Sequence, residues 1–326
     1  MPADRYTSII NRLVSRRSFS YTLECSPIHP MLLMILAAKS TSIRLVRLFV
    51  RSLLLALLCS LPPALANSDL LVIRHPDPPV SRIAHRNEYF VKVIELALSR
   101  AEIRYQLQPV TRPFGSTARN IRFLNSGLYD ISWLHTDKYK EKMLIPIRIP
   151  IFKGLIGWRV LLTSEARLDY LSKVKTQKEL ANLSFGLVSG WPDIRVMREA
   201  GFNVVTTSVA EDIPILIRHG KADLFSRSAI EVWDELDQYA GDGIVLDQHV
   251  ILKYPSATYL FVAKHNHRLA ELLTLGLQRA QDDGSFDQLF LQYFGSAIER
   301  TKFNSRKVIE IDNPDVPENT PLDNSR

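Results

Sequence analysis

Cysteine is scarce in this chain: only Cys25 and Cys59 occur among its 326 residues. Both lie before residue 67, so the rest of the chain carries no thiol. This absence excludes a cysteine nucleophile, a cysteine-ligated metal and a disulfide from that larger part. A chain of this length buries most of its surface on folding, so it does not need disulfides to be stable.

Several motifs of common enzymes are also missing. The sequence has no G-x-S-x-G nucleophile elbow, no H-E-x-x-H metal motif and no glycine-rich phosphate loop. His265 and His267 lie two residues apart in an expected loop, where surface exposure is a better interpretation than metal binding. We therefore expect no metal and no cofactor.

The apolar run at residues 52–61 is too short to cross a membrane, which takes about 20 residues. It follows three arginines and precedes a Pro-Pro break and the small residues Ala64 and Ala66. These are the three parts of a secretory signal peptide over residues 44–66, with cleavage expected after Ala66. A lipid on Cys59 is the alternative, but the bulky Leu in the preceding residues Ala56-Leu57-Leu58, where that processing needs Gly or Ala, disfavours it. We expect a presequence over residues 1–66 and a periplasmic protein.

Basic residues exceed acidic ones over the whole chain, with 41 Lys and Arg against 34 Asp and Glu. Eight of the basic and two of the acidic residues lie within residues 1–66, which leaves 33 and 32, a net charge of +1. The excess is confined to the presequence. A nearly neutral remainder is not typical of proteins that bind nucleic acid, so we expect no nucleic-acid partner.

Short apolar segments alternate with amphipathic ones from residue 69 onward. Residues 70–74 and 105–110 are typical of buried strands, and residues 89–101 between them have one apolar helical face. The alternation continues to a last helix that Gly295 is expected to end. Strands separated by helices predict parallel βαβ units and an α/β fold. Residues 311–326 are rich in Asn, Pro and acidic residues, which predicts a solvated tail.

Three segments make the chain resemble the family 3 solute-binding proteins of bacterial ABC transporters, whose typical members bind amino acids. Residues 125–133 (NSGLYDISW) and 219–226 (HGKADLFS) are similar to the family's L-x-x-G-x-x-D signature. Residues 254–295 are similar to its C-terminal block. The resemblance implies a two-lobe periplasmic binding protein fold of type II, in which each lobe is a mostly parallel sheet flanked by helices.

The resemblance also implies where the lobes begin and end. Two crossings of the chain, near residues 158–162 and 252–257, would form the hinge. Lobe 1 would be residues 69–158 plus 256–298, and lobe 2 would be residues 160–252. Residues 299–326 would be a polar C-terminal extension that is flexible at its end.

Family members that bind amino acids use an Arg in lobe 1 for the carboxylate and an Asp in lobe 2 for the amino group. Here Lys140 is nearest to the first position, if one residue is inserted, and a solvated charge run is the alternative. Arg227 occupies the second position, which reverses the charge and favours an anionic group. The alternative for Arg227 is an ion pair with Glu231, one helical turn later.

Other candidates follow from their place in strands and turns. A helix that starts at Pro192 after a glycine turn could bind an anion through its backbone N–H groups, unless Asp193 already satisfies them. Trp133 and Trp191 could stack on a ligand or belong to the core. The candidate ligand-binding residues are Arg74, His75, Trp133, His135, Thr136, Lys140, Arg159, Ser189, Gly190, Trp191 and Arg227.

These observations favour a monomeric periplasmic receptor that holds a small anionic or zwitterionic solute between two lobes, for an ABC permease of the inner membrane. One alternative is a cleft enzyme of the same fold, such as a dehydratase, with Glu231 or Glu141 as its general acid. Another is a stand-alone sensor module. The receptor interpretation assigns no catalytic residue.

Overall fold

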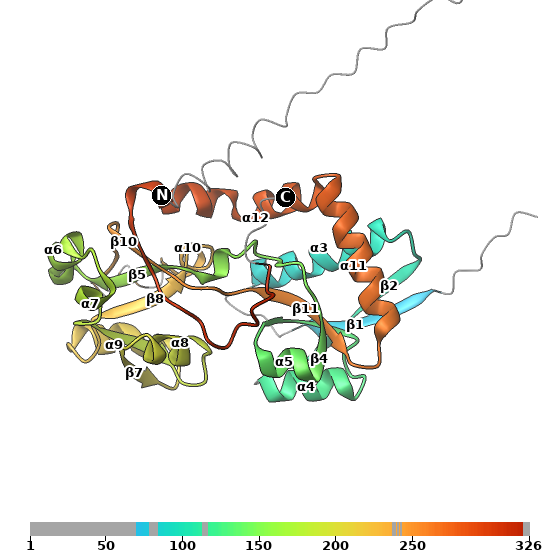
Figure 1. The fold of residues 1–326 in the computed structure, drawn as a ribbon, viewed down its shortest axis with the longest axis horizontal. Helices are drawn as coiled ribbons and strands as arrows, with labels where there is room; N and C mark the ends of the chain where they lie inside the picture. Colours follow the sequence, from blue (N-terminus) through green and yellow to red (C-terminus); the bar gives the residue numbers. More distant parts are fainter. Residues whose placement is uncertain are drawn as a thin grey trace, which may run out of the picture. The chain divides into compact units, whose positions relative to one another are not determined.

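The computed structural model describes residues 70–77, 84–112, 117–236, 239, 241 and 243–321, all of which belong to one structural unit. The expected signal peptide and the rest of the expected presequence lie outside the described residues. Figure 1 shows strands and helices alternating along the described part. We use lobe 1 for the sheets β1–β2 and β3–β11–β4 with their helices, and lobe 2 for the sheet that contains β5 to β8.

Lobe 1 contains two small sheets. β1 (Leu71–Asp77) pairs in parallel with β2 (Tyr105–Thr111) through the helix α3 (Ala84–Arg100), which is the βαβ unit that the alternation predicts. In the other sheet, β11 (Thr258–Ala263) lies between β3 (Ile131–His135) and β4 (Leu144–Ile147) and is antiparallel to both. Further helices of lobe 1 are α4 (Thr117–Asn125), α5 (Lys138–Met143), α11 (His267–Asp282) and α12 (Ser285–Thr301).

Lobe 2 is one mixed sheet with the strand order β12-β10-β5-β8-β6-β7, and β9 also pairs with β5. β6 is parallel to β7 and β8, whereas β5 is antiparallel to β8, β9 and β10. β5 (Trp158–Ser164) is buried at six of its seven residues, as befits a central strand with both faces covered. The other strands are β6 (Ser184–Val188), β7 (Asn203–Thr207), β8 (Leu224–Ser228), β9 (Ile244–Leu246), β10 (Val250–Lys253) and β12 (Lys307–Glu310), and the helices are α6 (Glu165–Lys173), α7 (Gln177–Leu180), α8 (Asp193–Glu199), α9 (Ile213–Arg218) and α10 (Val232–Glu235).

The chain passes between the lobes more often than the resemblance implies. Two passages run from β4 to β5 and from β10 to β11. A third passage, after α12, leads to β12, which pairs in parallel with β10. The chain then returns to lobe 1, where the backbone N–H of Lys138 donates to the carbonyl of Asp315 over 3.0 Å.

The prediction of a solvated tail is therefore wrong for residues 311–321. Apolar side chains are few in this segment, but those it has are placed against the lobes, so the low apolar content misled the prediction. Residues 322–326 lie outside the described residues. The buried residues of the segment are Ile311, Val316 and Thr320.

Two glycines of the C-terminal helices have opposite surroundings. α11 and α3 lie side by side (Figure 1), and a Cβ built on Gly276 would lie 1.8 Å from the carbonyl oxygen of Ala97. A Cβ on Gly295 would meet nothing within 4 Å. The expected helix end at Gly295 is wrong, because the buried face continues to Thr301 and the helix ends at Lys302, with φ of 49°.

These two glycines give a matched test of the α3–α11 contact. Gly276→Ala is expected to lower the free energy of unfolding by about 2–3 kcal/mol, because the two helix backbones must move apart. Gly295→Ala is expected to raise it by about 0.5–1 kcal/mol, because alanine is the better helix former. Urea denaturation followed by circular dichroism measures both, and equal effects would contradict the close approach.

Candidate functional site

A cavity of about 280 Å³ lies where lobe 1 meets Pro192 and Glu231 of lobe 2. Its apolar wall is aromatic, because the ring of Phe90 stacks on Trp133 with 4.5 Å between the centroids. Phe152 meets Phe90 edge-on, with 5.4 Å between the centroids. The polar residues that line the cavity are Arg86, Thr117, Asn120, His135, Lys140, Glu231 and Thr258.

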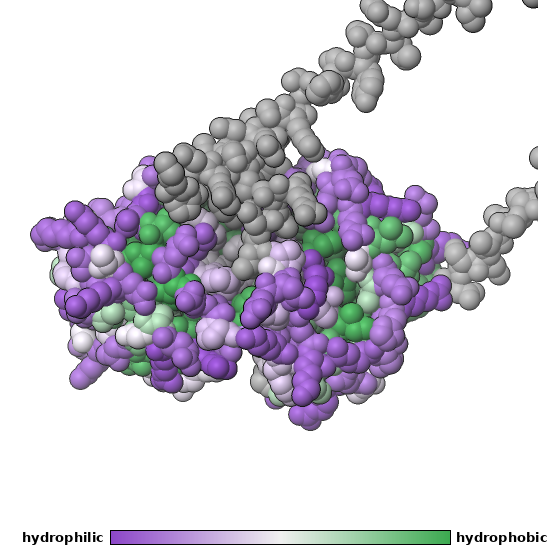
Figure 2. Space-filling model, in the orientation of Figure 1, coloured by the Kyte–Doolittle hydropathy of each residue, from purple (hydrophilic) through white to green (hydrophobic). Residues whose placement is uncertain are grey.

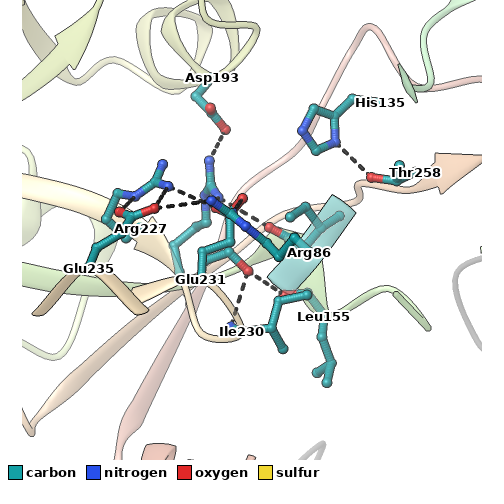
Figure 3. A network of polar contacts seen from close by, with 12 residues as sticks. Arg86, His135, Leu155, Asp193, Arg227, Ile230, Glu231, Glu235 and Thr258 are labelled. Carbon is teal, nitrogen blue, oxygen red and sulfur yellow. Dashed lines mark hydrogen bonds and ion pairs between the residues drawn. The ribbon is translucent and has the colours of Figure 1, made fainter. Parts of the chain in front are cut away.

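Three arginines and three carboxylates form a buried network beside this cavity. Arg227 at the end of β8 makes two hydrogen bonds of 2.6 Å to Glu235 and lies 3.3 Å from Glu231. Arg86 of α3 donates to Glu231 and, over 3.3 Å, to Glu235. Figure 3 shows these four side chains converging on one point. Each of the two carboxylates is therefore shared by Arg86 and Arg227.

The third arginine of the network, Arg159 on β5, is 5% exposed and pairs with Asp193 at the start of α8. A nitrogen of the same guanidinium lies 3.8 Å from Glu231. Asp193 also accepts a hydrogen bond from the hydroxyl of Tyr254, whose ring centroid lies 5.5 Å from the Arg159 guanidinium. The three positive and three negative groups balance, so the network has no net charge when all six are ionised.

The surroundings of Glu231 and Asp193 lower the pKa of both carboxylates. Burial by itself would raise the pKa of Glu231, but Arg227, Arg86 and Arg159 lower it from its ordinary value of 4.5 to about 2. The pKa of Asp193 is likewise lowered, since Arg159 and the Tyr254 hydroxyl outweigh its burial. Burial lowers the pKa of His135, which makes its imidazole neutral near pH 7. The ring accepts or donates a hydrogen bond of 2.9 Å with Thr258.

Two buried donors of this network are unused. Among the described residues, the Nε atoms of Arg86 and Arg159 have no hydrogen-bond partner. A buried donor without a partner is costly, since it has lost its water and gained nothing in return. Of these two arginines, Arg86 lines the cavity of about 280 Å³.

Two further hollows adjoin the cavity. One, of about 40 Å³, is lined by His135, Thr136, Arg159, Asp193 and Tyr254, among others. The other is an open groove of about 980 Å³ along Ser189, Gly190, Trp191 and Arg195. Pro192 lines all three spaces, so they meet at the start of α8. Figure 2 shows one face of the molecule, which is mostly hydrophilic with several hydrophobic patches.

Two kinds of site were not found in the part of the chain that the structure describes. No group of three or more His, Cys, Asp and Glu side chains is placed to hold a metal ion. No helix of this part combines the length and apolar character needed to span a membrane.

Comparison of the sequence with protein-family models gave no match, and comparison with curated proteins gave none. Comparison with solved structures gave many. YckB from Bacillus subtilis is 17% identical with a TM-score of 0.50, and the match covers 76% of this chain and 98% of YckB. The VFT2 domain of BvgS from Bordetella pertussis is also 17% identical with a TM-score of 0.50, covering 68% and 93%.

An ancestral arginine-binding protein, solved with arginine bound, is 14% identical with a TM-score of 0.49, and the match covers 69% of this chain and 98% of that protein. The chain has the two-lobe fold of periplasmic solute-binding proteins. The fold expected from the sequence resemblance is thus confirmed. At these identities the likeness concerns the fold and does not extend to a ligand.

The structure brings most of the predicted site residues of this two-lobe fold to the three spaces. Trp133, His135 and Lys140 line the cavity of about 280 Å³, and Thr136 and Arg159 line the smallest space. Their role in binding a ligand stays a prediction. The residues that line the open groove are Ser189, Gly190, Trp191 and again Lys140.

Several predicted ligand residues have partners within the protein. Lys140 is buried, which excludes the alternative of a solvated residue, and its ammonium pairs with Asp137. Arg227 forms the ion pair with Glu231 that was the alternative to ligand binding. Its guanidinium carbon lies 5.0 Å from the centroid of the Trp191 ring. The hydroxyl of Thr136 donates to Glu141 over 2.6 Å.

Arg74 and His75 line none of these three spaces in the described part of the chain. The guanidinium of Arg74 makes two hydrogen bonds of 2.8 Å to Asp130, at the start of β3. The Nδ1 atom of His75 lies 2.9 Å from the carbonyl oxygen of Pro76. The expectation that both residues border the ligand site has no support from this geometry.

The predicted anion site at the start of α8 is also used internally. Pro192 is the N-cap of this helix, and Asp193 follows in its first turn. The Asp193 carboxylate pairs with Arg159 and Tyr254, and the backbone N–H groups of Ile194 and Arg195 donate to carbonyl groups of Trp191 and Pro192. Gly190, with φ of +85°, provides the left-handed turn before the helix.

Sequence reasoning missed Arg86 and Glu235 as members of the site. Arg86 precedes the periodic apolar segment from which α3 was expected, and it lies 145 positions from Glu231. No local pattern marks such a pair. Glu235 lies four residues after Glu231 and eight after Arg227, a helical spacing that could have suggested it.

Asp193→Asn tests the contacts of Asp193 with Arg159 and Tyr254 in the network. The substitution leaves the buried Arg159 without its nearest carboxylate, so we expect the free energy of unfolding to fall by about 3–5 kcal/mol. Asp169→Asn is the control, because Asp169 pairs with Lys173 at the surface, with both side chains more than two-thirds exposed. That change should cost less than about 0.5 kcal/mol. A similar small loss in both variants would contradict the network.

The lowered pKa of Glu231 predicts acid sensitivity. Because its folded-state pKa lies below its ordinary value, Glu231 stabilises the fold above about pH 4.5 and loses this contribution as the pH falls toward 2. The contribution is about 3 kcal/mol. In urea titrations between pH 5 and 2.5, Glu231→Gln should show a shallower loss of unfolding free energy than the native protein. Parallel curves would contradict the prediction.

Proposed function

We propose that this chain is an extracytoplasmic receptor that binds one small zwitterionic or anionic solute between its two lobes. The observation that carries this proposal is the cavity of about 280 Å³ between the lobes, which the charged residues Arg86 of lobe 1 and Glu231 of lobe 2 line together with an aromatic wall. The Glu231 carboxylate faces the same cavity as Arg86 and supplies an acceptor for a cationic group. A cavity of about 280 Å³ suits a solute of amino-acid size.

The balance of charges favours a zwitterion over a plain anion. The network already matches three guanidinium groups with three carboxylates, so an anion would add an uncompensated charge to a buried space. A zwitterion adds none. The aromatic wall of Phe90, Trp133 and Phe152 offers a surface for an apolar side chain of the solute.

The dehydratase alternative needs a carboxyl group that holds a proton near neutral pH. The lowered pKa of Glu231 keeps that group ionised. Glu141 accepts hydrogen bonds from Arg148 and from the Thr136 hydroxyl, and it lines none of the three spaces described above. These two observations favour a receptor over an enzyme, and the sequence resemblance favours an ABC permease of the inner membrane as its partner.

A screen of matched solutes tests the receptor. Leucine, 4-methylpentanoate and 3-methylbutylamine share an apolar skeleton and differ in charge, and analogous sets can be built on other skeletons. A ligand that binds only the folded state raises the melting temperature. We expect shifts with zwitterions, smaller ones with anions and none with amines. No shift with any solute, or turnover of one, would contradict the proposal.

Trp133→Ala is expected to weaken binding of the best solute by about tenfold or more, because it removes the ring that stacks on Phe90 at the cavity wall. Tyr139→Ala is the matched control, since Tyr139 is an aromatic residue of the same lobe with 60% of its surface exposed. Isothermal titration calorimetry measures both dissociation constants. Equal affinities in the two variants would show that the solute does not bind in this cavity.

A further inference from the structure

Arg86 is a lobe 1 residue that forms ion pairs with lobe 2. It lies in the first turn of α3, and its guanidinium contacts Glu231 and Glu235 of lobe 2. The three side chains are 7%, 14% and 12% exposed. These contacts join parts of the chain that are 145 and 149 residues apart.

The charges of the two faces explain the contact. Lobe 2 supplies Arg159 and Arg227 against Asp193, Glu231 and Glu235, which leaves one negative charge without a partner of its own. On the lobe 1 side, Arg86 is the countercharge, since Lys140 pairs with Asp137 and the lowered pKa of His135 makes it neutral. Separating the lobes would therefore separate unlike charges.

The geometry on the lobe 2 side reduces the cost of this contact. A buried ion pair often gains little, because removing both charges from water offsets their attraction. Here the double hydrogen bond from Arg227 already fixes the Glu235 carboxylate, and Arg227 and Arg159 both lie near Glu231. The two acceptors are thus oriented before Arg86 reaches them, which lowers the entropy cost of the contact.

We propose that Arg86, with Glu231 and Glu235, is a latch that keeps the two lobes together in the absence of any solute. The protein then has mostly closed molecules in solution, and a solute enters by competing with Arg86 for the lobe 2 carboxylates. Closure by the latch does not require the proposed ligand, so it can be tested on the protein alone.

The test measures the distance between two spin labels in the purified, solute-free protein. Cys25 and Cys59 are first replaced by serine, and single cysteines are introduced at Arg122 of α4 and Arg198 of α8, both exposed. Residues of these two helices line the open groove from opposite lobes. Electron–electron double resonance should give one short, narrow distance distribution for the otherwise native chain.

Arg86→Leu should lengthen and broaden that distribution. Arg100→Leu is the matched control, because it removes an arginine of the same helix from an ion pair with Asp283 within lobe 1 and should leave the short distance in place. A cooperative thermal transition shows that each variant is folded. If Arg86→Leu does not fold, the double variant Glu231→Gln and Glu235→Gln removes the same contact from the other side.

A long or broad distribution in the native chain would overturn the latch, whatever the variants do. So would an unchanged distribution in a folded Arg86→Leu protein, or equal opening in both leucine variants. The solute screen tests the proposed function separately. A closed protein that binds no solute would support the latch and contradict the receptor. An open protein that binds zwitterions keeps the receptor and loses the latch.

Discussion

The carboxylates of Glu231 and Glu235 are the acceptors on which the middle of this molecule depends. Both are shared between guanidinium groups, and the sharing involves one arginine of lobe 1 and one or more of lobe 2. A carboxylate has enough lone pairs for such sharing, and the arrangement keeps every charge close to an opposite one. Both side chains join lobe 2 to Arg86 of lobe 1, and Glu231 also lines the cavity.

The ion pairs of Arg227 change the interpretation of its departure from the family that the sequence resembles. Arg227 stands where the resemblance implies an acidic residue in amino-acid binders, but its guanidinium forms ion pairs with Glu235 and Glu231. The reversal that seemed to favour an anion in the sequence is therefore compensated eight residues later. Glu231, four residues after Arg227, lines the cavity from the lobe 2 side.

Regular local patterns were predictable from the sequence, and contacts between distant segments were not. The βαβ unit of β1, α3 and β2 follows from short apolar runs around an amphipathic segment. The Arg227–Glu231 pair follows from its spacing. The contact of Arg86 with Glu231 could not be predicted, since no local sequence pattern indicates a partner 145 positions away. The antiparallel course of β5 was also missed, because the crossing between lobes reverses strand direction without a local signal.

The strand β12 has a practical meaning for anyone who shortens this chain. Residues 299–326 look dispensable, since the family resemblance ends before them. Yet β12 is the partner of β10 on the side away from β5. A protein cut at residue 298 would present the backbone of β10 as a bare sheet edge, with the apolar Val250, Ile251 and Leu252 along it. Such edges recruit strands from other molecules, so the shortened protein would be prone to aggregate during expression.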